Sequence, residues 1–186
     1  TSGTTMAALR GKSHHPTLAV YDASMTTNFK HRFMPDRDTI RMGILFPDEE
    51  VMPNSSLAHY LALALRHFGA PNSRYVWHQD GINFTSVFAE LEHAETTGEP
   101  YALLGASFSF VHLTDEMRRL GKSSNLPVGS RILDTGGFKG QSREVELDDF
   151  YSQLSARLGV PRRQCINMYG MTELSTQFYD WGNETC

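Results

Sequence analysis

The fold of this chain is indicated by the segment RILDTGGFKGQSREVELDDFYSQLSARLGVPRRQCINM, residues 131–168. Its start, Arg131 to Leu133, is a short apolar run that leads into two glycines and is typical of a buried strand. Leu147 to Leu158 is then predicted to be a helix, because Gly159 follows where a helix would stop. Gln164 to Met168 is a second apolar run. Strand, helix and strand in this order predict two parallel strands joined by a crossover helix.

The same alternation continues through the upstream part of the chain. Strands are expected at 39–46, 74–78 and 101–104, and helices at 17–33, 57–68, 85–97 and 111–120. The expected fold class is therefore α/β, with a mostly parallel sheet and helices on both faces. Such sheets bind ligands beyond the carboxyl ends of their strands. The loops after Leu104, Leu133 and Met168 are therefore the expected binding loops.

Composition places the chain among ordinary globular proteins. Its 186 residues are about one domain, 40% of them are hydrophobic, and 20% are charged. The net charge of -4 gives no basic excess that would favour a nucleic-acid partner. No apolar run is long enough to span a membrane. The two cysteines, Cys165 and Cys186, are expected to be free thiols in the cytoplasm, although a disulfide between them stays an alternative.

A cluster of hydroxyl side chains opens the sequence. Four hydroxyl residues and one glycine occupy the first five positions, namely Thr1, Ser2, Gly3, Thr4 and Thr5. Hydroxyls and backbone N–H groups of this kind can wrap a polyphosphate, and Lys12 downstream can neutralise phosphate charge. The spacing is not that of a Walker-type phosphate loop. A plain polar terminus is the alternative interpretation.

A second cluster follows the last expected strand. Tyr169, Gly170, Met171, Thr172 and Glu173 place an aromatic ring, a hydroxyl and a carboxylate in a tight turn. The ring can stack on a flat base, the hydroxyl can donate to a phosphate, and the carboxylate can bind Mg²⁺. The alternative is a strand end whose last residues only begin a helix.

Together the motifs resemble those of the acyl-adenylate-forming superfamily of ATP-dependent enzymes. Residues 1–5 resemble its phosphate-binding loop, and residues 167–173 resemble its Tyr-Gly-x-Thr-Glu motif. Within the superfamily, residues 104–112, 136–139 and 172–180 most resemble the LuxE-type acyl-protein synthetases. The resemblance covers essentially the whole chain.

The resemblance implies a role for each motif residue. The ATP phosphates would be held by Thr1, Ser2, Gly3, Thr4 and Thr5, with Lys12 neutralising phosphate charge. The adenine site would be lined by Gly136, Gly137 and Tyr169, next to Gly170 and Met171. Thr172 would contact the α-phosphate and Glu173 would bind Mg²⁺, which makes these two the catalytic residues. The acyl pocket would lie near Ser107, Phe108, Phe110 and His112.

The implied activity is ATP-dependent conversion of a carboxylic acid, expected to be a fatty acid, into an acyl-adenylate. The acyl group would then pass to a thiol of a protein or of coenzyme A. The chain is expected to be a partial adenylation domain, residues 1–186, without an N-terminal segment and a small C-terminal domain, and inactive alone. Met6 and Ala7 depart from the superfamily pattern. A non-catalytic nucleotide-binding module and an interaction domain without a nucleotide site remain alternatives.

Overall fold

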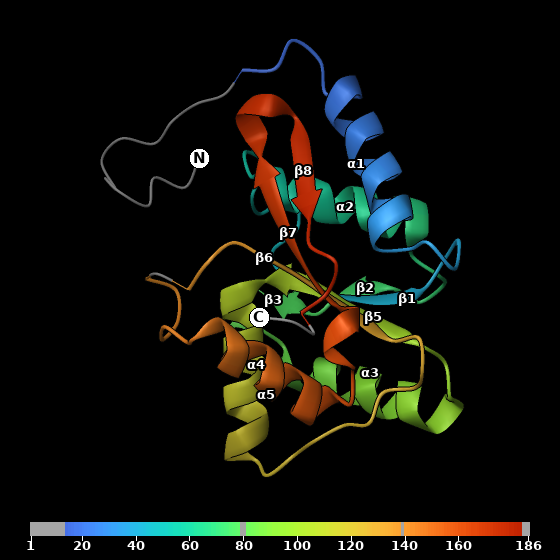
Figure 1. Ribbon diagram of the computed structural model, residues 1–186, viewed down its shortest axis with the longest axis vertical. Coiled ribbons are helices and arrows are strands. Elements are labelled where there is room, and N and C mark those ends of the chain that lie inside the picture. The colour runs from blue at the N-terminus through green and yellow to red at the C-terminus, as the bar shows by residue number, and fades with distance from the viewer. Residues whose placement is uncertain (1–13, 79–80, 139, 184–186) are drawn as a thin grey trace.

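The computed structural model describes residues 14–78, 81–138 and 140–183, and these form an α/β fold (Figure 1). Within them, six strands form one sheet in the order β2-β1-β5-β6-β7-β8. Their bounds are Arg74–Tyr75, Arg41–Leu45, Tyr101–Ala106, Arg131–Thr135, Cys165–Met171 and Thr176–Tyr179, in that order. The first five strands are parallel, and β8 is antiparallel to β7. The predicted mostly parallel sheet is confirmed.

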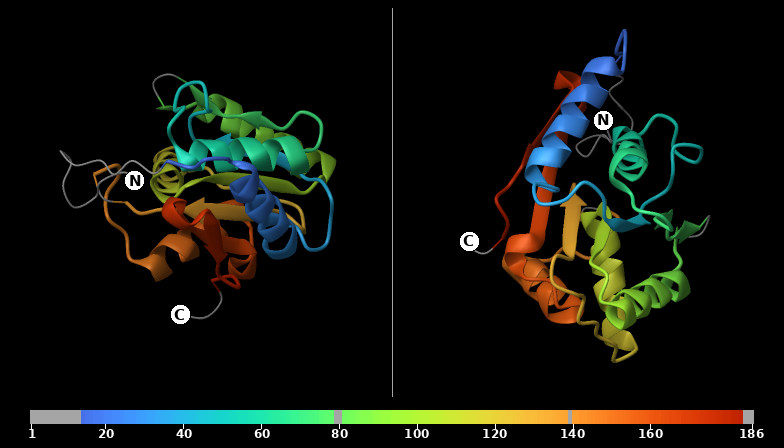
Figure 2. Two further views of the ribbon diagram at one scale, coloured as in Figure 1. Left: turned by 90° about the horizontal axis from the view of Figure 1, so that it is seen from above. Right: turned by 90° about the vertical axis from the view of Figure 1, so that its right-hand side faces the viewer.

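Helices cover both faces of this sheet, as predicted (Figure 2). They are α1 Ala19–Arg32, α2 Ser56–Phe68, α3 Phe84–Thr97, α4 Ser107–Arg119 and α5 Leu147–Leu158. Helices α1 and α2 share one core with the sheet, whereas α3, α4 and α5 share the other. Side chains of β5 alternate between them, with Leu104 in the first core and Leu103 in the second. No helix in the described part of the chain has the length and apolar content needed to cross a membrane.

Local sequence signals set several helix ends. The Ser55 hydroxyl accepts a hydrogen bond from the Ala58 amide at 3.2 Å and so caps the start of α2. Helix α3 ends at Gly98, whose φ of 71° is left-handed. Helix α5 has the bounds that the sequence predicts, Leu147–Leu158. These signals act within one turn of the chain and need no tertiary contact.

Three elements differ from the sequence-based prediction. Helix α4 was expected to begin at Val111, but it begins at Ser107, directly after β5 and without a loop. The strand expected over 74–78 is split into β2, in the sheet, and β3, Trp77–His78, which pairs with β4, Gly81–Ile82. Strand β8 was not expected. Strands β3 and β8 each pair with a strand close in sequence, β4 and β7, and the residue pattern of one strand does not report which partner it pairs with.

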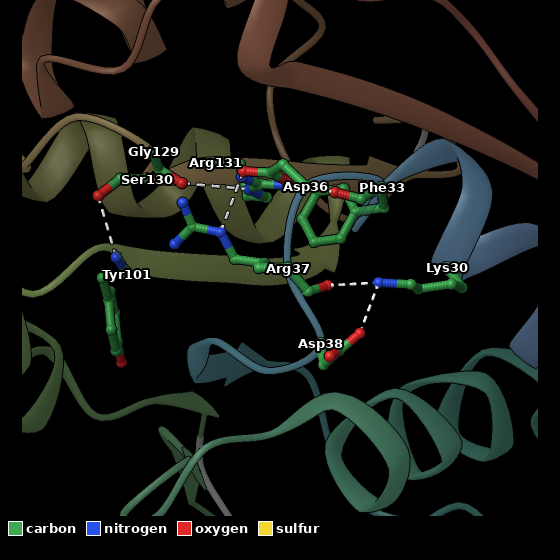
Figure 3. Close-up of polar contacts among 9 residues, drawn as sticks. All are labelled: Lys30, Phe33, Asp36, Arg37, Asp38, Tyr101, Gly129, Ser130 and Arg131. Atoms are coloured by element: carbon green, nitrogen blue, oxygen red, sulfur yellow. Dashed lines mark hydrogen bonds and ion pairs between the residues drawn. The ribbon is translucent and has the colours of Figure 1, made fainter.

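A buried arginine anchors the amino end of the sheet (Figure 3). Arg131, the first residue of β6, donates to the Phe33 carbonyl at 2.6 Å and to both carboxylate oxygens of Asp36 at 2.8 and 2.9 Å. This bidentate hydrogen bond holds the pKa of the Asp36 carboxyl well below its usual range. Beside it, the Ser130 hydroxyl accepts from the Tyr101 amide at 3.0 Å. The loop after α1 is thereby fixed to the starts of β5 and β6.

We expect Gly105→Ala to destabilise the fold by about 1–3 kcal/mol, through overpacking in the centre of the sheet. A methyl group at Gly105 would lie 2.9 Å from both the Cβ and the carbonyl oxygen of Leu45 in β1. Urea denaturation followed by circular dichroism measures the effect. The matched control is Gly137→Ala, whose methyl group would meet nothing within 4 Å. Equal stability of the two variants would contradict the prediction.

Candidate functional site

Strands β5 and β6 end side by side at the carboxyl edge of the sheet, and β7 runs on past them. Ala106 of β5 lies opposite Thr135 of β6, and Thr135 lies opposite Met168 of β7. The next residue on each strand is Ser107, Gly136 and Tyr169, respectively. The Ser107 hydroxyl oxygen is 3.2 Å from the Gly136 carbonyl oxygen. The segments after Leu104, Leu133 and Met168 thus lie side by side, but the prediction that they are loops is wrong in part, because β5 runs to Ala106, β6 to Thr135 and β7 to Met171.

The turn after β6, formed by Gly136 and Gly137, exposes its backbone. Gly136 has a φ of 81°, a conformation that side-chain-bearing residues rarely adopt. At both glycines, the place where a Cβ would stand has no neighbour within 4 Å. Beyond the turn, Phe138 packs against Phe150 of α5 with ring centroids 5.2 Å apart. The backbone at the turn is thus open to close approach by a ligand.

A buried carboxylate lies beneath this turn, at Asp134, which is 1% exposed. Its Oδ2 accepts from the Ser107 hydroxyl at 2.6 Å and from the Asn167 side-chain amide at 3.0 Å. Its Oδ1 accepts from the Tyr151 hydroxyl of α5 at 3.0 Å. Burial raises the pKa of Asp134 to about 6, and the three donors limit the rise. Sequence reasoning did not assign Asp134 a role, and its one signal was a carboxylate within an apolar run.

Strands β7 and β8 form a hairpin that projects beyond the other strands (Figure 1). Tyr169 of β7 is 60% exposed, and it lies opposite Phe178 of β8. The hairpin tip is a short helical turn over Thr172–Leu174, in which Glu173 is exposed. Gly170 and Met171, also predicted site residues, complete β7 before the tip.

The hairpin tip contacts two other parts of the chain. The Thr172 hydroxyl donates to the Ser56 hydroxyl at 2.8 Å, at the first residue of α2. The Ser175 hydroxyl lies 3.1 Å from Nδ1 of His15. The predicted residues Thr1, Ser2, Gly3, Thr4, Thr5 and Lys12 lie outside the described residues. The nearest described residues downstream of them, around His15, therefore lie beside the tip that carries Thr172 and Glu173.

The four residues expected near an acyl pocket separate into two groups. Ser107 is buried, and its hydroxyl donates to Asp134. Phe108 is partly buried and packs near Phe46, with ring centroids 6.5 Å apart. His112, one helical turn later, is exposed and lies against the Phe108 ring. Phe110 is fully buried in the core on the other face of the sheet. The structure thus keeps Phe108 and His112 together and places Phe110 away from them.

No group of three histidine, cysteine or carboxylate side chains that could hold a metal ion occurs among the described residues. Glu173 alone would supply one carboxylate oxygen to Mg²⁺. Magnesium commonly takes one or two protein carboxylates and completes its shell with water and substrate phosphates. An exposed glutamate at the hairpin tip fits that mode of binding, in which the nucleotide supplies the other ligands.

No protein-family model and no curated protein matches this sequence. The functional conclusion therefore depends on the geometry of the strand ends and of the hairpin tip, together with the motifs that lie there.

An ionic cluster beside the site joins α1, α2 and the loop after β1. Nε2 of His59 lies 2.8 Å from Oδ1 of Asp22, and Nδ1 lies 2.5 Å from Oε1 of Glu49. Burial lowers the pKa of His59, but the hydrogen bonds and charges of Glu49 and Asp22 together raise it above the ordinary 6.5. Since both ring nitrogens face carboxylates, the cluster is complete when the imidazole is protonated.

We expect the free energy of unfolding to fall as the pH rises above about 6.5. The pKa of His59 is higher in the folded state than in the unfolded state. Its contribution to stability is therefore fully present below the unfolded-state pKa and is lost as the pH rises through the folded-state pKa. The step is expected to be ~1 kcal/mol or less, because the carboxylates are partly exposed to water. Urea titrations at several pH values should show this step in the wild type and not in His59→Gln. His67→Gln, on the exposed side of α2, is the control that should keep it. Superimposable pH profiles for His59→Gln and the wild type would refute the assignment.

Proposed function

We propose that this chain is the nucleotide-binding part of an enzyme that activates a carboxylic acid with ATP. The observation that carries the proposal is the convergence of Gly136, Gly137 and Tyr169 at the carboxyl edge of the sheet, where α/β proteins bind ligands. Gly136 and Tyr169 follow the paired residues Thr135 and Met168, so an open glycine backbone and an exposed aromatic residue occur on neighbouring strands. This arrangement suits a flat base that needs one stacking surface and close backbone contact.

The hairpin tip is the proposed phosphate side of the site. Thr172 offers a hydroxyl and Glu173 a carboxylate, and Thr172 touches the first turn of α2 through Ser56. The start of a helix carries a partial positive charge that favours phosphate nearby. His15, which follows the Ser/Thr-rich start of the chain, also contacts the tip. A nucleotide would thus extend from Tyr169 towards Thr172.

The proposed reaction joins the acid to AMP. A carboxylate oxygen attacks the α-phosphorus of ATP, and the bond from that phosphorus to the departing pyrophosphate breaks. Magnesium would offset the phosphate charge, and the Thr172 hydroxyl would donate to an α-phosphate oxygen instead of to Ser56. In this step the residues of the chain bind and orient the reactants, and no side chain forms a covalent bond.

The proposal also covers the carboxylic acid substrate and the thiol that accepts its acyl group. A fatty or other apolar acid is favoured because Phe46 and Phe108 place aromatic rings near the carboxyl ends of β1 and β5. The acyl group would pass to a protein thiol or to coenzyme A. Cys165 is a poor candidate for that thiol, since burial raises its pKa to about 12. A cytoplasmic location, where ATP and free thiols occur, is part of the proposal.

Carboxylate-dependent exchange between ATP and pyrophosphate tests the activity directly. It is measured on the longest reading frame that contains this chain, with a panel of fatty and aromatic acids. Glu173→Ala is expected to reduce the exchange at least ~100-fold, because a magnesium ligand contributes several kcal/mol to the transition state. Glu92→Ala, at an exposed position of α3, is the matched control. ATP binding without exchange for any acid would favour a non-catalytic nucleotide-binding module, and absence of both would reject the nucleotide site.

Tyr169→Ala tests the proposed base-stacking surface. Loss of an aromatic platform costs about 1–3 kcal/mol per stacked base, so ATP affinity is expected to fall about 5- to 150-fold. Isothermal titration calorimetry with ATP and with tripolyphosphate separates the base from the phosphates, and only ATP should be affected. Trp181→Ala removes a still more exposed ring that lies against Arg32 instead, and it should leave the affinity unchanged. Equal losses in the two variants would contradict stacking at Tyr169.

A further inference from the structure

The hydroxyl group of Ser107 has more acceptors in reach than protons to donate. Its oxygen lies 2.6 Å from Oδ2 of Asp134, 3.1 Å from the Thr135 carbonyl oxygen and 3.2 Å from the Gly136 carbonyl oxygen. A serine hydroxyl has one proton and therefore makes one strong donated bond at a time. Where that proton points decides whether the carbonyl groups at the glycine turn are bonded to α4.

The charge of Asp134 determines which acceptor receives the Ser107 proton. An ionised carboxylate is the strongest of the three acceptors and is also the nearest, so it takes the Ser107 proton. A neutral carboxylic acid has its own proton to donate. With that proton on Oδ2, Asp134 donates to Ser107, and the Ser107 proton turns to a backbone carbonyl of Thr135 or Gly136.

The other neighbours of Asp134 do not offer an equal route. Asn167 approaches Oδ2 with its side-chain N–H, which is a donor only. The Tyr151 hydroxyl can accept a proton from Oδ1, and its other side-chain hydrogen-bonding neighbour is Asn167, whose side chain already donates to Asp134. Ser107 is the one hydroxyl in this network with two carbonyl oxygens ready to receive the displaced proton.

We propose that Asp134 is a positioning residue that controls the glycine turn through Ser107. Ionised Asp134 draws the Ser107 proton away from the turn, and neutral Asp134 directs that proton to the carbonyl groups of Thr135 and Gly136. The turn is thus bonded to the start of α4 in one charge state and released in the other.

The surroundings of Asp134 permit this change of charge. The titratable groups that face it are Tyr151 of α5, Cys165 of β7 and Asp180 after β8. The pKa values of Tyr151 and Cys165 are raised well above neutrality, so both stay protonated while Asp134 titrates. Asp180 carries a like charge that favours the neutral form of Asp134. The change therefore occurs near pH 6.

Carbon-detected NMR of the ¹³C-labelled chain tests the proposal, from about pH 4 to about pH 8. The side-chain carboxyl carbon of Asp134 reports its charge, and the backbone carbonyl carbons of Thr135 and Gly136 report the hydrogen bond to the turn. We expect at least one of these carbonyl carbons to titrate with the midpoint of Asp134. In Ser107→Ala, Asp134 should still titrate, and the carbonyl response should be lost.

Tyr151→Phe is the second variant and leaves Ser107 intact. It removes a donor that stabilises ionised Asp134, so the Asp134 midpoint is expected to move to higher pH, with the carbonyl midpoint moving equally. A carbonyl response that persists in Ser107→Ala, or that does not follow Asp134 in Tyr151→Phe, would overturn the proposal. So would an Asp134 carboxyl that stays in one charge state throughout the range. No nucleotide is added, so the result is independent of the proposed enzymatic activity.

Discussion

The burial of the Asp134 carboxylate beneath the ends of three strands is the interaction on which the candidate site depends. Placing a carboxylate in a low-dielectric interior costs several kcal/mol unless donors surround it. The three donors come from three different elements: Ser107 begins α4, Tyr151 lies in α5, and Asn167 lies in β7. Satisfying this one group therefore fixes the mutual positions of the segments that end at the site. The same carboxyl group can also become protonated. One group therefore both holds these segments in place and responds to pH.

The opposite end of β6 is held in a different way. Arg131 is bonded to Asp36 and to a backbone carbonyl, and a guanidinium keeps its charge at any ordinary pH. A second buried arginine, Arg41 at the start of β1, bonds to Glu90 of α3 at 2.5 Å. The amino edge of the sheet is thus held by ion pairs of two buried arginines, while the carboxyl edge contains a buried carboxyl group whose pKa is raised to about 6.

Local signals made part of this structure predictable. The Ser55 cap, the left-handed Gly98 and the bounds of α5 follow from interactions within one helical turn. Strand β8 and the early start of α4 were missed, because each depends on pairing or packing that the local pattern does not contain. A loop over 107–110 would let Phe108 and Phe110 share a pocket. In a helix, residues two apart point in clearly different directions, and this is why the structure separates them.

The candidate site could be predicted only in outline, for a similar reason. The loops were identified because parallel strands end at one edge, and the Tyr169–Glu173 motif was identified from its residue types. Asp134 was not, because its donors lie 17 to 33 residues away in sequence. A carboxylate at the end of a strand has many possible meanings until its neighbours are known. Whether such a carboxylate belongs to a buried hydrogen-bond network or to a solvated loop depends on the tertiary structure.

Strand β7 explains how one motif can serve both halves of the proposed site. Its first residues, Cys165 to Met168, pair with β6, and its last, Met168 to Met171, pair with β8. The change of pairing partner at Met168 lets the β7–β8 hairpin extend beyond the other strands of the sheet. Tyr169 therefore stays beside the Gly136 turn, while Thr172 reaches the start of α2. A ligand with a flat end at Tyr169 and a charged end at Thr172 would bind along one continuous strand. The Asp134 network would then set the position of the glycine turn against which the flat end of the ligand lies.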